Sequence, residues 1–209
     1  LLANIDKPDA WTRRAYEATG GYEAVRKVIG KMAPKDVAET VKNSGLRGRG
    51  GAGFPTGLKW TFLPQNHPGP IYFCLNADES EPGTFNNRVL MELDPHQVLE
   101  GMMISCYATN CKTAYYFMRC EYPLAYKRTL AAIQECYDAG YLGKNIFGTD
   151  YSLDIFLHRG AGAYICGEET GLIESLEGKR AWPRIKPPFP AVEGAFRKPT
   201  VVNNVETAA

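Results

Sequence analysis

Glycine and cationic residues with clear binding chemistry are concentrated between Ser44 and Trp60, in the segment SGLRGRGGAGFPTGLKW. Glycine lets backbone N–H groups approach a ligand closely, and Arg47, Arg49 and Lys59 add positive charge. This composition suits a loop that binds phosphate; the alternative is a flexible surface turn. Residues 48–53 fit the pattern G-x-G-x-x-G, but they follow a predicted helix, whereas the dinucleotide fingerprint follows a strand.

Three carboxylates follow a predicted strand and form the second group. Asp78, Glu79 and Glu81 lie within four residues, beside Asn76 and Ser80. Clustered like charges are costly unless they are solvated, paired or hydrogen-bonded. They could form an acidic surface turn, bind a divalent cation, or accept hydrogen bonds from a ligand. We favour the last, with a ribityl or ribose chain and a flavin ring edge as ligand groups.

A third group lies in Gly160–Thr170, where glycines follow a predicted strand and precede a helix. This arrangement places a ligand at the start of the helix. Glu168 and Glu169 could instead serve only to stabilise the positive helix end. Cys166 is not expected to be a nucleophile, because the three histidines lie in unrelated contexts and offer it no base: His67, His96 and His158.

Several residues could stack on or bond to a flat ring. Prolines stiffen the segment that carries Lys186 and Phe189, which favours presentation of the phenylalanine to a flat partner; the alternative is a structural linker. Phe54 and Phe62 are similar candidates, with core packing as the alternative. The pair Asn203 and Asn204 offers amide donors and acceptors together, which is a weak signal alone.

The elements that position these groups alternate between strands and helices. Strands are predicted at 71–75, 113–118 and 153–157, a helical turn at 56–62, and helices at 22–31, 34–43, 95–109, 123–139 and 168–177; residues 1–20 read as irregular. This order predicts an α/β fold, a Rossmann-like, mostly parallel sheet flanked by helices after a short helical N-terminal segment. We divide the chain into segment 1–45 and an α/β domain at 46–209. Ligands of such sheets bind outside the carboxyl ends of the strands.

Composition narrows the class of protein. The 209 residues carry a net charge of +1, with 44% hydrophobic and 22% charged residues, which is typical of a globular domain and argues against nucleic-acid binding. No apolar run approaches the roughly 20 residues of a membrane span, so no membrane insertion is expected. None of the six cysteines forms a C-x-x-C pair, so we expect free thiols and no metal site here. The chain begins without Met, and we expect it to be a fragment.

Five blocks in the same order resemble the NADH-binding flavoprotein (51-kDa, F) subunits of respiratory complex I: Ser44–Trp60, Asn76–Thr84, Arg159–Lys179, Pro183–Pro190 and Pro199–Thr207. The resemblance implies bound FMN and NAD(H). The positions matching the family's FMN contacts are Gly48, Arg49, Gly50, Gly51, Lys59, Asn76, Asp78, Glu79, Ser80, Tyr164, Gly167, Glu168, Glu169, Asn203 and Asn204. Those matching its NADH contacts are Phe54, Phe62, Glu81, Glu169, Lys186 and Phe189, with Glu81 and Glu169 as the catalytic pair that holds nicotinamide or ribose.

The implied reaction is hydride transfer from NADH to FMN, followed by single-electron transfer to an iron–sulfur cluster. The family's 4Fe-4S ligands, its ubiquitin-like domain and its cluster-binding domain would lie beyond residue 209. Implied partners are the 24-kDa (E) 2Fe-2S subunit and the 75-kDa (G) iron–sulfur subunit, on the cytoplasmic side of a bacterial membrane or the matrix side of a mitochondrial one. Alternatives are the NADH-linked subunit of a soluble hydrogenase or formate dehydrogenase, and a flavin-free binding or assembly protein.

A few positions depart from the family pattern. Gly171 stands where Ala is usual and Ala181 where Gly is usual, while Ala195 and Arg197 occupy a loop that normally has Leu and Gly. Arg197 in place of Gly predicts a change in local loop geometry.

Overall fold

A sheet of four parallel strands, in the order β3-β2-β1-β4, forms the centre of the molecule. The computed structural model describes residues 1–64 and 66–209. The strands are β1 (Tyr72–Ala77), β2 (Thr113–Met118), β3 (Asp154–Arg159) and β4 (Thr200–Asn204). The chain proceeds from β1 outward to β3 and then crosses to the other side of β1. The order therefore reverses between β1 and β4.

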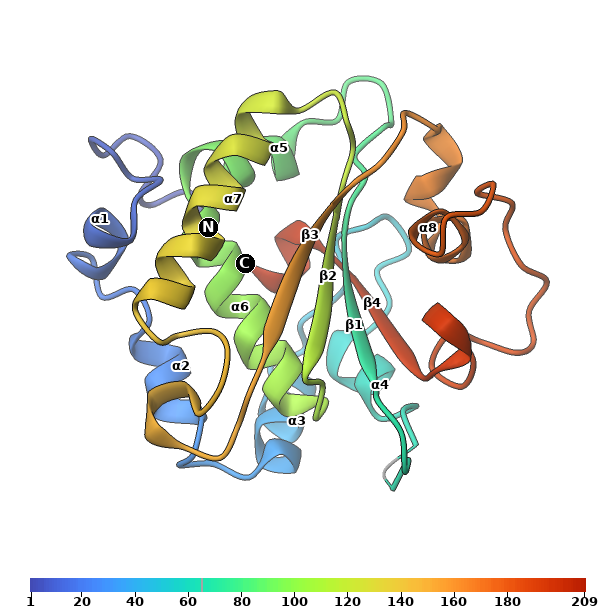
Figure 1. Cartoon of the computed structure of the whole chain (residues 1–209), viewed down its shortest axis with the longest axis horizontal. Coiled ribbons are helices and arrows are strands. Elements are labelled where there is room, and N and C mark those ends of the chain that lie inside the picture. The colour runs from blue at the N-terminus through green and yellow to red at the C-terminus, as the bar shows by residue number, and fades with distance from the viewer. Residues whose placement is uncertain (65) are drawn as a thin grey trace.

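Helices cover both faces of the sheet (Figure 1). One face carries α5 (Asn86–Leu93), α6 (Pro95–Ala108) and α7 (Pro123–Asp138), and the other carries α8 (Glu169–Leu176). The remaining elements are α1 (Arg13–Glu17), α2 (Glu23–Val28), α3 (Pro34–Asn43), α4 (Thr56–Trp60), α9 (Val205–Ala208) and the 3₁₀ turns η1 (Ile146–Gly148), η2 (Tyr164–Gly167) and η3 (Ala195–Arg197). The α/β fold with a parallel sheet is confirmed.

Successive side chains of each strand point to opposite faces of the sheet, and this alternation divides the buried apolar residues into two clusters. On β1, Phe73 and Leu75 are buried toward the large cluster that includes Leu99 and Met102 of α6. Cys74, between them, belongs to the smaller cluster beneath α8. Side chains two apart share a face of a strand, so this pattern fixes which residues support α6 and which support α8.

The N-terminal helices pack against α6 through a buried carboxylate. Glu100 accepts hydrogen bonds from the Tyr16 hydroxyl at 2.6 Å and from the backbone N–H groups of Tyr22 at 2.8 Å and Val25 at 2.9 Å. Tyr22 and Val25 also lie in the same apolar cluster as α6. The segment is thus held by both polar and apolar contacts, and a boundary at residue 45 stays a proposal.

Most predicted elements are confirmed, and four helices and strands were missed. The predicted ranges 34–43 and 113–118 match α3 and β2, while α1, α5, β4, α9 and the three 3₁₀ turns were not predicted. The start of α5 explains one omission, because its first amides are capped from outside the helix: Glu79 accepts from the N–H groups of Asn87 at 2.8 Å and Arg88 at 3.0 Å. A cap this far upstream leaves no local N-cap signal.

The loop that departs from the family pattern has an unusual backbone. Phe196 and Arg197 adopt φ angles of 52° and 56°, in the left-handed region where glycine is favoured. Gly171 is tightly enclosed, since a Cβ there would lie 2.5 Å from the carbonyl oxygen of Ile165.

None of the helices within the described residues is both long and apolar enough to cross a membrane.

Candidate functional site

A cavity of about 860 Å³ opens beside the carboxyl ends of β1 and β4, where the strand order reverses. This is the position at which parallel α/β sheets bind ligands, and the volume suits a cofactor-sized molecule. The cavity brings together residues from five separated segments. Its lining is Gly48, Gly50, Ala52, Gly53, Phe54, Thr56, Lys59, Phe62, Asn76, Gly167, Glu168, Glu169, Lys186, Phe189, Pro190, Ala191, Val192, Thr200, Val201, Val202, Asn203, Asn204 and Thr207.

The glycine loop forms one wall as a narrow hairpin. Arg47 and Pro55 form an isolated antiparallel bridge, and the Gly48 N–H donates to the Phe54 carbonyl at 2.8 Å. The Arg49 N–H donates to the Thr207 hydroxyl of α9 at 2.8 Å, which fastens the loop to the end of β4. Gly51, at the tip, has a φ of 116°, a conformation that L-residues with side chains rarely adopt.

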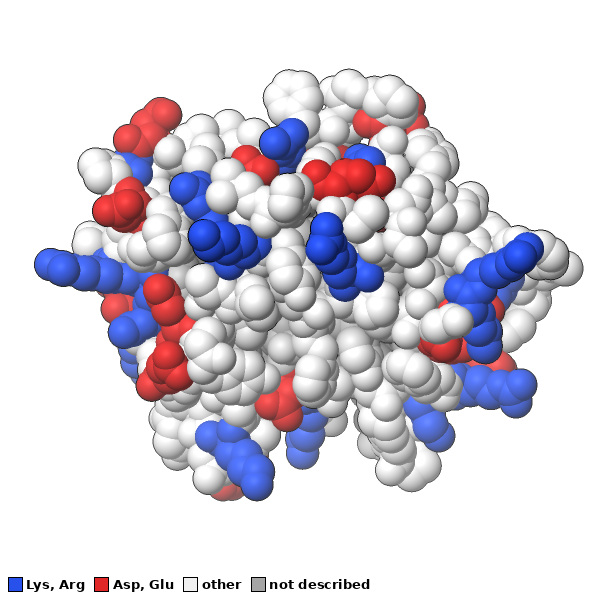
Figure 2. Space-filling model, turned by 45° about the horizontal axis from the view of Figure 1, so that its top comes forward, with Lys and Arg blue, Asp and Glu red and all other residues white. Residues whose placement is uncertain are grey.

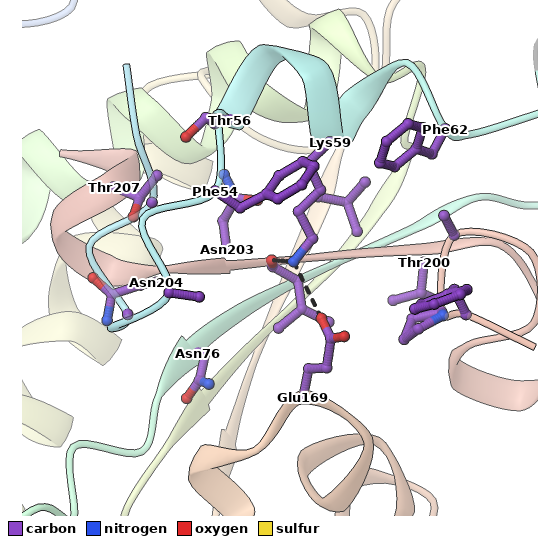
Figure 3. A pocket seen from close by; sticks show the side chains of 18 of the residues that line it. Phe54, Thr56, Lys59, Phe62, Asn76, Glu169, Thr200, Asn203, Asn204 and Thr207 are labelled. Carbon is purple, nitrogen blue, oxygen red and sulfur yellow. Dashed lines mark hydrogen bonds and ion pairs between the residues drawn. The ribbon is translucent and has the colours of Figure 1, made fainter. Parts of the chain in front are cut away.

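Two lysines and one carboxylate connect the walls of the cavity. Lys59 Nζ lies 3.1 Å from Glu169 Oε2 and donates to the Val202 carbonyl at 2.8 Å (Figure 3). Lys186 Nζ lies 2.9 Å from Glu169 Oε1. Burial disfavours the ionised form of Glu169, but the two ammonium groups outweigh burial and lower the pKa of this carboxyl.

Glu168 is held beside Glu169 by the start of α8. Its Oε2 accepts from the N–H groups of Thr170 at 2.8 Å and Gly171 at 2.9 Å, and its Oε1 lies 3.0 Å from Lys186 Nζ. Burial opposes ionisation, yet these hydrogen bonds lower the pKa of Glu168. Burial also opposes the charge of Lys186, but its two carboxylate partners outweigh burial and raise the pKa of this lysine. Both predicted glutamates therefore reach the cavity as anions.

Amide side chains occupy the strand ends. Asn76 donates from Nδ2 to the Gly167 carbonyl at 2.9 Å and accepts from the Asp78 N–H at 3.1 Å, joining β1 to η2. Asn204 accepts from the Glu206 N–H at 2.9 Å and so caps α9. Asn203 is 5% exposed, and its Nδ2 has no hydrogen-bond partner among the described residues. A buried amide of this kind is costly unless a ligand bonds it.

The opposite end of the cavity is aromatic. The ring centroids of Phe54 and Phe62 lie 5.9 Å apart, and the two side chains point to the same end in Figure 3. They are 44% and 53% exposed, and Phe189 is 57% exposed. Exposed aromatic rings around a cavity are suited to stacking on a flat ligand. In Figure 3, Phe62 lies on the side of the cavity away from Asn204, and Phe189 also lines the cavity.

Some predicted residues do not line this cavity: Arg49, Gly51, Asp78, Glu79, Ser80, Glu81 and Tyr164. The Glu79 carboxylate faces α5 and the Tyr122 hydroxyl at 3.2 Å. Asp78 accepts from Ser80 at 2.9 Å, and its pKa is raised by burial, which outweighs this hydrogen bond. Tyr164 donates to Glu81 near the surface. The acidic loop therefore meets the cavity mainly through Asn76.

Other lining residues were missed from the sequence. Thr56 is 3% exposed, and its hydroxyl has no partner among the described residues. Thr200 and Val202 lie on β4, which was not predicted. Thr207 lies in one of the blocks that resemble the family, but only its contact with Arg49 shows a role. Prediction of a strand at residues 200–204 would have indicated Thr200 and Val202.

The cysteines do not form a reactive centre. All six are free; five are buried and Cys120 is half-buried. Burial raises the pKa of Cys166 and raises the pKa of Cys111 to about 12, which disfavours the nucleophilic thiolate. Within residues 1–64 and 66–209, no group of three or more His, Cys, Asp or Glu side chains could hold a metal ion.

Figure 2 shows the distribution of charged side chains on one face of the molecule. On the face in Figure 2, cationic and anionic side chains are interspersed across the described surface. Many are paired, as in Arg88 with Glu92 at 2.9 Å and Arg119 with Glu121 at 3.2 Å. The cavity, by contrast, is lined by both polar and aromatic side chains, which are suited to binding and orienting a ligand.

Comparisons with known proteins agree with this architecture. Residues 41–209 match the family described as the Nuo51 FMN-binding domain. The F 2 subunit of the NADH-quinone oxidoreductase of Rhizobium meliloti is 56% identical over 209 residues, 100% of this chain and 50% of that protein. The corresponding F subunit of Aquifex aeolicus is 55% identical over 100% of this chain and 49% of that protein, and that of Escherichia coli is 52% identical over 97% and 45%.

The chain spans about half the length of these curated relatives. Among solved structures, an NAD⁺-reducing [NiFe]-hydrogenase in the H₂-reduced state has a similar chain, with a TM-score of 0.82 and 39% identity over 93% of this chain and 33% of that one. By its match over residues 41–209, this chain belongs to the Nuo51 FMN-binding domain family.

Proposed function

We propose that this chain binds FMN and NADH as the NADH dehydrogenase part of the F subunit of an NADH-quinone oxidoreductase. The observation that carries the proposal is the cavity between β1 and β4, which collects residues from all the sequence blocks that resemble this family. Relatives with 50–56% identity bear the name of this F subunit. Because those relatives are about twice as long, the activity of the whole protein is part of the proposal.

The polar end of the cavity fits FMN. Gly50 and Asn204 are neighbours on the cavity wall, since a Cβ at residue 50 would be in ordinary contact with the Asn204 side chain at 3.4 Å. The free Nδ2 of Asn203 supplies a buried donor for a polar edge of a ligand. Lys59 adds a cation. We assign FMN contacts to the glycine loop, Lys59, Asn76, Gly167, Glu168, Glu169, Asn203 and Asn204, and keep Arg49, Gly51, Asp78, Glu79, Ser80 and Tyr164 as proposed contacts.

The aromatic end fits NADH. We propose that Phe54, Phe62 and Phe189, which all line the cavity, enclose an adenine ring. Lys186 lines the same cavity and lies 2.9 Å from Glu169. Glu81 and Glu169 are proposed to hold the nicotinamide or its ribose. Bound FMN would supply the chemistry of hydride acceptance and of single-electron transfer onward. The contribution of the chain is to hold both ligands in register and to exclude water from the contact between them.

The complex and its location are proposed from the same family. The F subunit belongs to a multisubunit NADH dehydrogenase, and we propose the E (24-kDa) and G (75-kDa) iron–sulfur subunits as neighbours. We place the chain in the peripheral arm, on the cytoplasmic side of a bacterial membrane or the matrix side of a mitochondrial one. We propose that a 4Fe-4S cluster is bound by the part of the full-length protein that lies outside this chain.

A second candidate is the NADH-linked subunit of a soluble hydrogenase, which the similar hydrogenase chain supports. Its 39% identity is lower than the 50–56% shared with the NADH-quinone oxidoreductase relatives, so we favour complex I. Neither candidate changes the chemistry proposed for the cavity.

Reconstitution with FMN tests the proposal. The flavin absorbance at about 450 nm should be retained after desalting and should bleach on addition of NADH under anaerobic conditions. Retained flavin without bleaching at millimolar NADH would exclude the dehydrogenase function. Failure to retain flavin would favour a flavin-free binding protein. Asn203→Leu, which removes the free amide, should weaken FMN binding about tenfold.

A further inference from the structure

The loop that carries Lys186 and Phe189 to the cavity is anchored from outside by Arg184. Its Nε lies 2.5 Å from Glu174 Oε1 and its Nη2 lies 2.9 Å from Glu177 Oε1. Its Nη1 donates to the Gly194 carbonyl at 2.8 Å. One guanidinium therefore ties the loop to α8 and also to the returning part of the same loop.

The backbone of Arg184 leads directly to the cavity. Its N–H donates to the Thr170 hydroxyl at 2.8 Å, and this hydroxyl donates to Glu168 Oε2 at 2.5 Å. Glu168 in turn holds Lys186, two residues beyond Arg184. Three hydrogen bonds thus connect Arg184 to Thr170, Thr170 to Glu168, and Glu168 to Lys186, and the backbone of residues 184–186 completes the ring. Arg184 itself does not line the cavity.

Apolar contacts do little to hold this part of the loop. Trp182 is 73% exposed and Ile185 is 89% exposed, so neither side chain is packed against the body of the protein. Arg184, by contrast, is one-quarter exposed at its side chain, between carboxylates that are 17% and 7% exposed. Partly buried, multidentate pairs of this kind hold geometry better than exposed ones. The guanidinium is the main anchor of residues 182–186.

We propose that Arg184 is a positioning residue for the dinucleotide, which sets the placement of Lys186 and Phe189 at the cavity. The inference rests on the proposed function. Arginine is required because its planar fork reaches two carboxylates and a carbonyl at once, whereas a lysine ammonium cannot match that arrangement. Of the proposed FMN contacts, those of the glycine loop and the strand ends lie outside this network. Glu168 belongs to it, but its Oε2 also accepts from the N–H groups of Thr170 at 2.8 Å and Gly171 at 2.9 Å, and these bonds do not involve Arg184.

The test compares Arg184→Lys with the matched control Arg180→Lys, since Arg180 is exposed and lies on the same segment. Titration calorimetry gives the dissociation constants of FMN and of NAD⁺, and ferricyanide reduction gives KM and kcat for NADH. Arg184→Lys should raise the NAD⁺ dissociation constant and the NADH KM about tenfold, with FMN affinity and kcat within about twofold. Amide exchange across residues 184–190 should become faster, while Arg180→Lys should change none of these quantities.

Two further variants keep the test decisive if Arg184→Lys folds poorly. Thr170→Ser keeps the hydroxyl and should retain NAD⁺ affinity, whereas Thr170→Val removes it and should weaken NAD⁺ binding. Unchanged NAD⁺ affinity in Arg184→Lys or Thr170→Val, or an equal loss of FMN affinity, would overturn the role of Arg184. A wild-type chain that binds no flavin or is not reduced by NADH would instead refute the proposed function, so the two failures are distinguishable.

Discussion

Lys59 and Lys186 hold opposite oxygens of the same carboxylate. Lys59 Nζ lies 3.1 Å from Glu169 Oε2, and Lys186 Nζ lies 2.9 Å from Glu169 Oε1. One lysine comes from α4 and the other from the loop after α8, so Glu169 joins two parts of the chain that are more than a hundred residues apart. The cavity is therefore closed by electrostatic pairing as well as by packing.

This shared carboxylate predicts that the two lysines act non-additively. Lys59→Met and Lys186→Met should each weaken NAD⁺ binding. The double variant should lose less than the sum of the two losses, with a coupling energy of about 1 kcal/mol, because the second substitution acts on a carboxylate that is already partly released. Calorimetric NAD⁺ titrations of the four proteins give this energy. Lys42→Met, at an exposed pair with Glu39, serves as the control. Strict additivity would show that Glu169 does not couple the lysines.

Thr207 predicts a separate effect on the glycine loop. Its hydroxyl accepts from the Arg49 N–H at 2.8 Å, and the Arg49 side chain also lies 3.9 Å from Glu206 of the same helix, α9. Thr207→Val leaves that amide without an acceptor, which costs about 1–3 kcal/mol and should raise the FMN dissociation constant about tenfold or more. Thr207→Ser retains the hydroxyl and should bind FMN as the wild type does. Equal FMN affinity in Thr207→Val and Thr207→Ser would contradict this role.

The fold was largely predictable because its strongest signals are local. Pro34 and Pro95 occupy the first turns of α3 and α6, where proline is favoured. The start of α5 escaped prediction because its cap is the side chain of Glu79, which lies outside the helix. The strand β4 is five residues long and leads directly into α9, so its identity depends on pairing with β1 across the sheet.

The site was predictable in its residue types but not in its contacts. Glycine, lysine and asparagine residues marked the polar end, since each has a chemistry that is visible in isolation. Glu79 shows the limit: its carboxylate accepts hydrogen bonds from the first amides of α5, a contact that its residue type does not indicate. The network from Arg184 to Glu168 has no sequence signature, because it depends on how the loop folds back on α8.

His96 predicts a pH dependence of stability. It is enclosed between the Tyr22 hydroxyl at 2.6 Å, Glu135 at 3.1 Å and Cys136, with Arg13 and Glu17 nearby, and burial lowers its pKa from 6.5 to about 4. The unfolded chain therefore binds this proton more tightly. The stability contributed by the neutral form is complete above pH 6.5 and is lost progressively as pH falls to about 4.

Denaturant unfolding at several pH values measures this effect, which should amount to roughly 3 kcal/mol. His96→Asn should flatten the slope between pH 6.5 and 4, while His67→Asn should leave it unchanged. Glu168 and Glu169 act in a lower window, because their lowered pKa values preserve stability until the pH falls below 4.5. A slope that persists in His96→Asn would assign the effect to other groups.

The close packing of Gly101 in α6 against α9 leads us to expect that a larger side chain at residue 101 weakens FMN binding in the cavity. A Cβ at residue 101 would lie 1.7 Å from the carbonyl oxygen of Ala208, a backbone atom that no side-chain rotation can move away. Gly101→Ala must therefore displace α9, and it should cost about 3 kcal/mol or more in the free energy of unfolding. Because α9 carries Thr207 and is capped by Asn204, the folded fraction should also bind FMN more weakly.

Gly140→Ala is the control, because residue 140 has a positive φ and no neighbouring atom within 4 Å. It should cost only about 1 kcal/mol in the free energy of unfolding and leave FMN binding intact. A Gly101→Ala protein with wild-type stability and FMN affinity would show that α9 can move without disturbing the loop.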